Sequence, residues 1–363
     1  MTSLFDTLPL ARGPALKNRF MLAPLTNLQS HTDGTLSEDE FRWLVKRAEG
    51  GFGLTMTCAA HVQAKGQGFP GQLGIFDDAH LPGLTRLAAA LNRQGTHSVV
   101  QLHHAGMRSP KELIGEAPHC PSDNEEFSAR AMSLDEVKDS RDAFIAAAVR
   151  AQTAGFHGVE LHGAHGYLIC QFLSGEVNQR TDEYGGSFEN RRRFLDECIA
   201  GVRAACGPDF SLGVRLSPER FGIDFGECLQ LAESQMTSGE IDYLDMSLWD
   251  VFKAPGDPAY SGKSLLHWFS ELPRGNCRLG AAGKIMTGGQ CLDALESGLD
   301  FVVIGRAAIL HHDFPKKVET QADFAPIALP VPEAHLVAEG LGPTFVTYMK
   351  TWKGFVAEAA AQA

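Results

Sequence analysis

A regular alternation of β-prone runs and helical segments is the strongest constraint that this sequence places on its fold. Eight short runs rich in apolar and β-branched residues recur along the chain, each followed by a helical pattern or a loop. They span residues 20–23, 54–59, 97–103, 158–162, 210–216, 243–247, 284–287 and 301–305. This repetition predicts an α/β fold in which parallel strands close into a single (β/α)₈ TIM barrel.

Amphipathic helical segments fill the intervals between these runs, at residues 37–49, 79–94, 135–154, 191–205, 226–238 and 290–297. Ser133 and Glu136 have the spacing of a capping box, and Gly155 stands where the third of these helices is expected to stop. A doubly wound sheet is the alternative arrangement for such a chain. It lacks support, because no Gly-x-Gly-x-x-Gly turn follows the first strand.

The length of 363 residues suits one large barrel. No internal repeat or low-complexity linker divides the sequence, so we expect a single domain over residues 1–363. Residues 1–19 are expected to form an N-terminal cap, and residues 343–360 a C-terminal helix. The connections 105–133 and 163–189 are long, and loops of such length in a compact domain are commonly functional.

Composition narrows the class of partner. The net charge is −12, with 32 basic and 44 acidic residues, which argues against nucleic acid or an anionic membrane surface. No apolar run approaches the roughly 20 residues that span a bilayer, and no signal peptide is evident at the start. The eight cysteines include no Cys-x-x-Cys pair, which fits reduced thiols. We therefore expect a cytoplasmic protein, monomeric or homo-oligomeric, that acts on a small molecule.

The residues best suited to chemistry follow the fourth β-prone run, in the stretch 158–167. His162, His165 and Tyr167 fall within six positions, separated by glycine and alanine spacers that allow a tight turn. Two imidazoles can each offer an N–H to one substrate oxygen, and a phenol can deliver a proton beside them. Taken alone, the histidines could instead be a packed structural pair or half of a metal site. No further ligand recurs at metal-binding spacing, so no metal is expected.

Polar residues also follow several other strand ends, which in a barrel meet at the C-terminal face. The two glycine-bearing ends come after the seventh and eighth strands, where barrels commonly bind phosphate. Arg215 ends a buried strand and needs an anionic partner, either a ligand or a neighbouring carboxylate. The residues at these ends are Thr26, Gln101, Arg215, Gly288 with Gly289, and Gly305 with Arg306.

Longer motifs accompany these residues. They read His-Gly-Ala-His-Gly-Tyr-Leu at 162–168, Asn-Gln-Arg-Thr-Asp-Glu-Tyr-Gly-Gly-Ser-Phe-Glu-Asn-Arg at 178–191, Gln-Leu-x-His-Ala-Gly at 101–106 and Ile-Gly-Arg at 304–306. With these motifs the chain resembles the old yellow enzymes, a family of FMN-containing, NAD(P)H-dependent ene-reductases. The resemblance covers essentially the whole chain and implies a TIM barrel with FMN at its C-terminal mouth and NADH or NADPH as hydride donor.

The resemblance also implies a role for each matching residue. It places Thr26 at the carbonyl edge of the flavin, Gln101 at the pyrimidine side and Arg215 near N1. It implies that His162 and His165 hold the carbonyl oxygen of the substrate and that Tyr167 is the proton donor. The flavin would further contact Ala23, Pro24, Leu25 and Ala59, and the phosphate Gly288, Gly289, Gly305 and Arg306.

The function expected from this resemblance is reduction of the C=C bond of α,β-unsaturated carbonyl compounds. Related flavin chemistry stays open, namely nitro or nitrate-ester reduction, desaturation or demethylation. Outside the family, the alternatives are a metal-dependent barrel hydrolase or lyase and a barrel that binds flavin without catalysis. Thr26 and Leu28 replace a cysteine and a tyrosine of one subgroup, and Met107 replaces an arginine, with Arg108 next to it. These departures leave the substrate and the oligomer undetermined.

Overall fold

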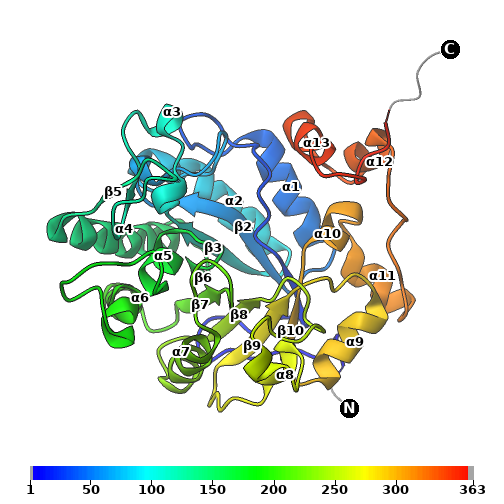
Figure 1. Ribbon diagram of the computed structural model, residues 1–363. Coiled ribbons are helices and arrows are strands. Elements are labelled where there is room, and N and C mark those ends of the chain that lie inside the picture. Colours follow the sequence, from blue (N-terminus) through cyan, green and yellow to red (C-terminus); the bar gives the residue numbers. More distant parts are fainter. Residues whose placement is uncertain (1–2, 359–363) are drawn as a thin grey trace.

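The structure is a computed structural model that describes residues 3–358 (Figure 1). Eight parallel strands form a closed barrel in the order β1-β10-β9-β8-β7-β6-β3-β2. The predicted (β/α)₈ TIM barrel is thereby confirmed. The strands are β1 Phe20–Leu22, β2 Leu54–His61, β3 His97–His103, β6 Gly158–Gly163, β7 Ser211–Leu216, β8 Tyr243–Ser247, β9 Arg278–Ala282 and β10 Phe301–Ile304.

Helices surround the barrel, and most begin at a side-chain cap that the sequence supplies. Ser133 and Glu136 form the predicted capping box of α4, and Ser37 caps α1 through the N–H of Glu40. In the part of the chain that the structure describes, no helix has the length and apolar character needed to cross a membrane. The outer helices are α1 Glu38–Glu49, α2 Leu81–Arg93, α4 Leu134–Thr153, α6 Phe188–Ala205, α7 Phe225–Thr237, α8 Leu265–Ser270, α9 Gly288–Glu296 and α10 Arg306–Leu310.

Large side chains close the N-terminal half of the barrel. Tyr243 and Phe301, each the first residue of its strand, are buried and pack edge to face with ring centroids 5.9 Å apart. Two glycines make room for them: a Cβ on Gly213 would lie 2.1 Å from Tyr243 Cζ, and one on Gly280 would lie 2.1 Å from Phe301 Cε2. Because this end is filled, the space for a ligand is left at the C-terminal mouth.

One strand lies earlier in the chain than the sequence predicted. The expected seventh strand at 284–287 is wrong, because the barrel strand is β9 at Arg278–Ala282. Gly283 and Lys284 have φ values of 158° and 55°, which break the extended conformation, and the following residues lead into α9. The true strand contains Gly280 and two alanines, so it lacks the β-branched and aromatic residues on which the prediction relied.

The segments outside the barrel contain more short elements than expected. The predicted C-terminal helix 343–360 is too long, since α13 ends at Lys350; residues 359 and 360 lie outside the described residues. In the N-terminal cap, Leu8 and Leu16 pair through a β-bridge and pack against the closed end of the barrel. The short elements are η1 Ala64–Gly66, η2 Asp78–His80, η3 Gly106–Arg108, α3 Lys111–Ile114, β4 His119–Cys120, β5 Arg130–Ala131, α5 Leu168–Leu173, η4 Pro258–Tyr260, α11 Phe314–Thr320, α12 Glu333–Ala338 and α13 Pro343–Lys350.

Candidate active site

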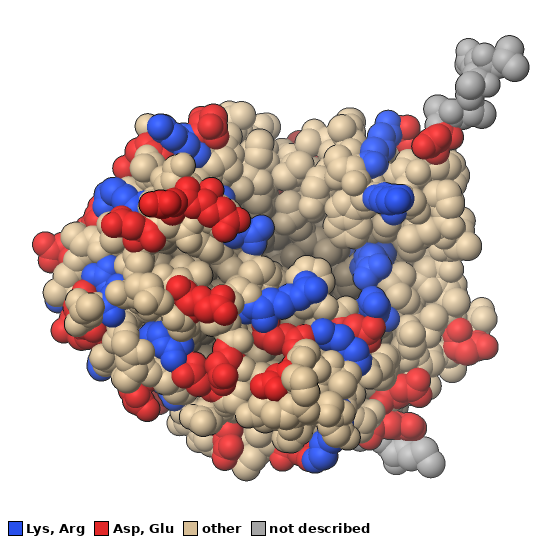
Figure 2. Space-filling model, viewed as in Figure 1, with Lys and Arg blue, Asp and Glu red and all other residues tan. Residues whose placement is uncertain are grey.

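A cavity of about 560 Å³ opens at the C-terminal mouth of the barrel. Figure 2 shows the corresponding hollow in the surface, with basic side chains around it. Strand ends and the loops after them supply most of its walls, and Tyr348 and Trp352 close it from the C-terminal segment. The predicted site residues that line it are Ala23, Pro24, Leu25, Thr26, Ala59, Gln101, His162, His165, Tyr167, Arg215, Gly305 and Arg306.

Gly288 and Gly289, which the sequence predicted at the phosphate, are not among the residues that line this cavity. The N–H of Gly288 donates to the carbonyl of Phe324 at 2.9 Å, so it is not available to a phosphate. A Cβ on Gly288 would lie 2.1 Å from the carbonyl oxygen of Ala322, so glycine serves close packing at this helix start. The loop Gly283–Met286 lines the cavity in place of the glycine pair.

His162 and His165 form a directed chain of hydrogen bonds. The N–H of Ala164 donates to His162 Nδ1 at 3.2 Å, which leaves the ring proton of His162 on Nε2. That atom lies 3.3 Å from His165 Nδ1, and His165 Nε2 lies 2.7 Å from Ser247 Oγ. The two imidazole N–H groups are therefore arranged in series, with His165 and Ser247 as their acceptors. A substrate oxygen would have to replace these acceptors to receive both donors.

Burial keeps these groups in their neutral forms. It lowers the pKa of His162 well below its usual value, helped by the neighbouring His165. The pKa of His165 falls to about 3, because of burial and then the charges of Arg215 and Arg108. Burial raises the pKa of Tyr167, although Arg108 acts in the opposite direction. At neutral pH the site therefore holds two neutral imidazoles and a protonated phenol.

A second polar group forms the floor of the cavity inside the barrel. Arg215 Nη1 lies 3.3 Å from Asp245 Oδ2, so a carboxylate neighbour supplies one anionic partner. Gln101 Nε2 donates to Glu160 Oε1 at 2.8 Å. Burial raises the pKa of both Glu160 and Asp245, the former further because Asp245 lies near it. Within residues 3–358 the buried Nε of Arg215 has no hydrogen-bond partner, so its guanidinium retains donor capacity beside the cavity.

Comparison with known proteins identifies the group to which this architecture belongs. The NADH:flavin oxidoreductase / NADH oxidase family matches residues 3–323. The chain belongs to this family. It is 36% identical over 327 residues to the Bacillus subtilis protein named Probable NADH-dependent flavin oxidoreductase YqiG, covering 87% of each chain. It is also 36% identical to an NADPH dehydrogenase from Bacillus pumilus, covering 87% of this chain and 94% of that protein.

A solved old yellow enzyme homologue from Zymomonas mobilis has the same fold. It matches with a TM-score of 0.80 and 28% identity, over 95% of this chain and 99% of that one. The protein is thus an NADH- or NADPH-dependent flavin oxidoreductase of the old yellow enzyme family, and the prediction of FMN and a nicotinamide donor is confirmed.

The residues around the cavity of this flavin oxidoreductase fit an FMN molecule. Arg215 and Gln101 present polar groups on the floor, and both line the cavity. At the other side, Gly305 leaves open space, since a Cβ there would meet only the side chains of Leu25 and Ala23, at 3.6 and 3.8 Å. Arg306 lines the same wall with an exposed side chain that suits an anionic phosphate.

His103 and His104 stand behind the cavity and do not line it. Gln72 accepts from the N–H of Gly68 and donates to Ala59 and to His103 Nδ1, at 2.9 and 3.0 Å, which places the His103 proton on Nε2. The His103 ring packs edge to face on Tyr167, with centroids 4.3 Å apart. His104 Nδ1 accepts from the N–H of Gly106. These two histidines therefore support the loop and the tyrosine.

Several residues of the cavity wall were not predicted. They come from loops without periodic pattern and from the distant C-terminal segment, so the sequence carries no local signal for them. Three of them have left-handed backbone conformations, Arg220, Phe221 and Trp249, with φ values of 70°, 56° and 60°. The unpredicted wall residues are Phe69, Arg108, Arg220, Phe221, Ser247, Trp249, Ala282, Gly283, Lys284, Ile285, Met286, Val303, Ile309, Tyr348 and Trp352.

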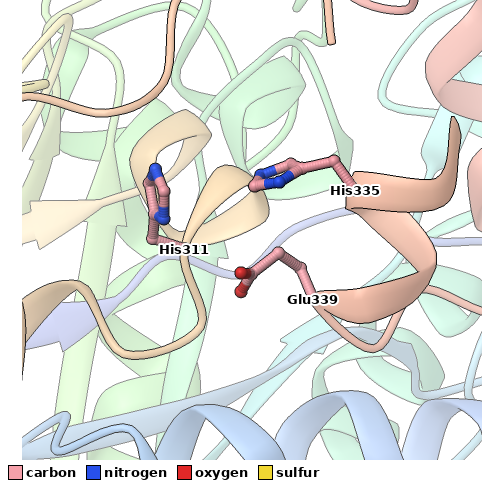
Figure 3. Close-up of side chains that lie close together, drawn as sticks. All are labelled: His311, His335 and Glu339. Atoms are coloured by element: carbon pink, nitrogen blue, oxygen red, sulfur yellow. The ribbon is translucent and has the colours of Figure 1, made fainter. Parts of the chain in front are cut away.

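A second histidine cluster lies away from the cavity (Figure 3). The ligating atoms of His311, His335 and Glu339 lie within 4.8 Å of one another. However, His311 Nε2 accepts from the N–H of Ile327, so its proton occupies Nδ1, and His335 Nε2 donates to the carbonyl of Leu310. A glutamate oxygen accepts from the backbone and ring N–H groups of His312. These bonds tie chain segments together and remove the lone pair that a metal would need on His311.

Proposed function

We propose that this enzyme takes hydride from NADH or NADPH and reduces the C=C bond of α,β-unsaturated carbonyl compounds. The observation that carries the proposal is the packed group of His162, His165 and Tyr167 at the mouth of the cavity. The two imidazole centroids lie 5.0 Å apart, and the phenol ring lies 5.1 Å from His162 and 6.5 Å from His165. All three line the cavity that the flavin is expected to share with the substrate.

The histidines are suited to hold a carbonyl oxygen on which negative charge develops. FMN, when bound, supplies the hydride that adds to the β-carbon. Both histidines are neutral and have defined tautomers, so each can donate one N–H without a change of protonation. Preorganised donors of this kind are worth roughly 10²–10³ in rate each, by analogy with oxyanion holes.

Tyr167 is suited to protonate the α-carbon. Its phenol keeps its proton at neutral pH, because burial raises its pKa, while the nearby Arg108 limits that rise. A positioned general acid contributes roughly 10²–10⁴ in rate. We assign Tyr167 as the proton donor because no other acid of the cavity wall packs against both histidines.

The remaining predicted residues are proposed to hold FMN. Arg215 would stabilise the negative charge near N1 of the ring, with Gln101 at the pyrimidine side and Thr26 at the carbonyl edge. Gly305 and Arg306 would bind the phosphate. Ala23, Pro24, Leu25 and Ala59 would contact the ring.

Anaerobic half-reactions test this function. The flavin-loaded protein is reduced with NADH or NADPH, then reoxidised with enones, nitro compounds or oxygen, while the flavin absorbance is followed. We expect reoxidation by enones with formation of the saturated ketone. If the flavin is reduced but no enone reoxidises it, the ene-reductase assignment is wrong and another flavin chemistry of the family applies.

A further inference from the structure

The cavity wall is basic although the protein as a whole is acidic. Five cationic side chains line it, and no aspartate or glutamate does so within residues 3–358. This contrasts with the net charge of −12. Figure 2 shows basic groups around the hollow and acidic groups farther out. A wall of this kind concentrates anions at the site. The five residues are Arg108, Arg215, Arg220, Lys284 and Arg306.

Three of the five cations have a partner or a role already. Arg215 pairs with Asp245 at the floor. Lys284 pairs with Asp250 at 3.0 Å. Arg306 lies next to Gly305, on the wall proposed for the phosphate. In the described part of the chain no carboxylate pairs with the other two, Arg108 and Arg220.

Arg108 is held beside the proton donor. Its Nη1 donates to the carbonyl of His165 at 2.5 Å, and its Cζ lies 4.9 Å from the centre of the Tyr167 ring. These contacts fix the direction of the guanidinium and use one of its five N–H groups. The remaining donors can bind a carboxylate in a bidentate manner.

The strand order separates Arg108 from the proposed phosphate site. Arg108 follows β3, which pairs with β6, the strand that carries His162. Arg306 follows β10, and β2 and β1 lie between β3 and β10 around the barrel. Arg108 therefore belongs to the part of the cavity where the substrate is held.

We propose that Arg108 binds a carboxylate of the substrate, so that the preferred substrates are α,β-unsaturated carbonyl compounds that carry a second, anionic group. This specificity rests on the proposed function of the site. The carboxylate takes no part in the bond changes: hydride reaches the β-carbon, Tyr167 gives the α-carbon its proton, and solvent reprotonates Tyr167.

Binding tests the specificity without turnover. Para-hydroxybenzoate and its methyl ester are titrated into the FMN-loaded protein, and the flavin spectrum reports the dissociation constants. We expect the acid to bind more tightly than the ester and added salt to weaken the acid selectively. Arg108→Met should reduce this preference by roughly 10- to 100-fold, the effect of one charge-assisted hydrogen bond. Equal affinities in the unaltered protein would overturn the proposal even if enones are reduced.

Turnover provides the second test, with β-acetylacrylate and its methyl ester as matched alkenes. Arg108→Met should lower the ratio of kcat/KM for acid over ester by the same roughly 10- to 100-fold. The matched control is Arg86→Met, since Arg86 is exposed and lies 4.2 Å over the Phe41 ring, away from the cavity. It should leave the ratio unchanged.

Other outcomes separate the competing explanations. If Arg108→Met slows both alkenes equally, Arg108 only positions His165, and the carboxylate proposal is wrong. If Arg220→Met lowers the ratio and Arg108→Met does not, the assignment to Arg108 is wrong. A slower flavin reduction by NADPH, with NADH and the acid preference unaffected, would assign Arg108 to the nucleotide phosphate. If neither alkene is reduced but the acid still binds more tightly, the proposed function fails while anion recognition stands.

Discussion

The histidines at the cavity and those around Glu339 have similar composition but different hydrogen bonding. His162 and His165 pass their donors along a chain that ends at Ser247, beside a cavity of about 560 Å³. In the other cluster, His335 and His311 bond to backbone groups that nothing in the site could replace. A side-chain acceptor such as Ser247 can be exchanged for a ligand oxygen, whereas backbone partners hold the fold together.

Helix α10 connects the two regions and shows the same contrast along its length. Its first residue, Arg306, lines the cavity with no carboxylate partner in residues 3–358. Its last residue, Leu310, gives its carbonyl to His335. Function therefore follows from whether the polar groups of a residue are satisfied within the protein, more than from residue type.

Tyr167→Phe should produce the largest effect at the cavity. The variant keeps the ring packing but lacks the acid, so enone reduction should slow by roughly 10²–10⁴. Flavin reduction by NAD(P)H needs no such proton and should be nearly normal. Stopped-flow absorbance separates the two half-reactions. Equal slowing of both would mean that Tyr167 positions ligands and is not the acid.

His162→Ala and His165→Ala test the contrast between the clusters directly. Each should slow enone reduction by roughly 10²–10³ and weaken phenolic inhibitors, with FMN still bound. His335→Ala is the matched control: it should leave the rate unchanged and lower the melting temperature. A loss of activity on chelation, in a protein that binds no FMN, would favour the metal-dependent alternative.

Arg306→Ala should weaken FMN binding by roughly 10- to 100-fold, because a charge-assisted hydrogen bond to the phosphate is lost. The melting temperature of the FMN-free protein should change little, since the side chain is exposed. Fluorescence titration with FMN measures the affinity. An unchanged affinity would place the phosphate elsewhere.

Glu339→Gln should give the smallest effect, confined to stability. Burial alone would raise the Glu339 pKa, but hydrogen bonds from the ring and backbone of His312 lower it to about 2. An unfolded glutamate titrates near ~4.3, so the ionised form stabilises the fold above that pH and the contribution is lost as pH falls toward 2. Unfolding of both proteins from pH 7 to pH 3 should show a gap of about 1–3 kcal/mol that shrinks below about pH 4. A gap independent of pH would assign the effect to packing.

Local pattern located most of the barrel but misplaced one strand. Seven of the strand regions contain β-branched or aromatic runs, and each coincides with a strand of the structure. The remaining one, Arg278–Ala282, consists largely of small residues because Gly280 must accommodate Phe301. The requirement comes from a residue on another strand, so no window of sequence could reveal it.

The sequence by itself determined the barrel, the family and the residues His162, His165 and Tyr167, because these depend on short spacings and on strand ends that always meet at one face. Only the tertiary structure decided how the histidines donate, since their tautomers depend on Ala164 and Ser247. It also decided that the N–H of Gly288 is engaged by Phe324 and that Arg108 lies against Tyr167. Such contacts join segments far apart in the chain, and their hydrogen bonds exist only once packing has brought the partners together.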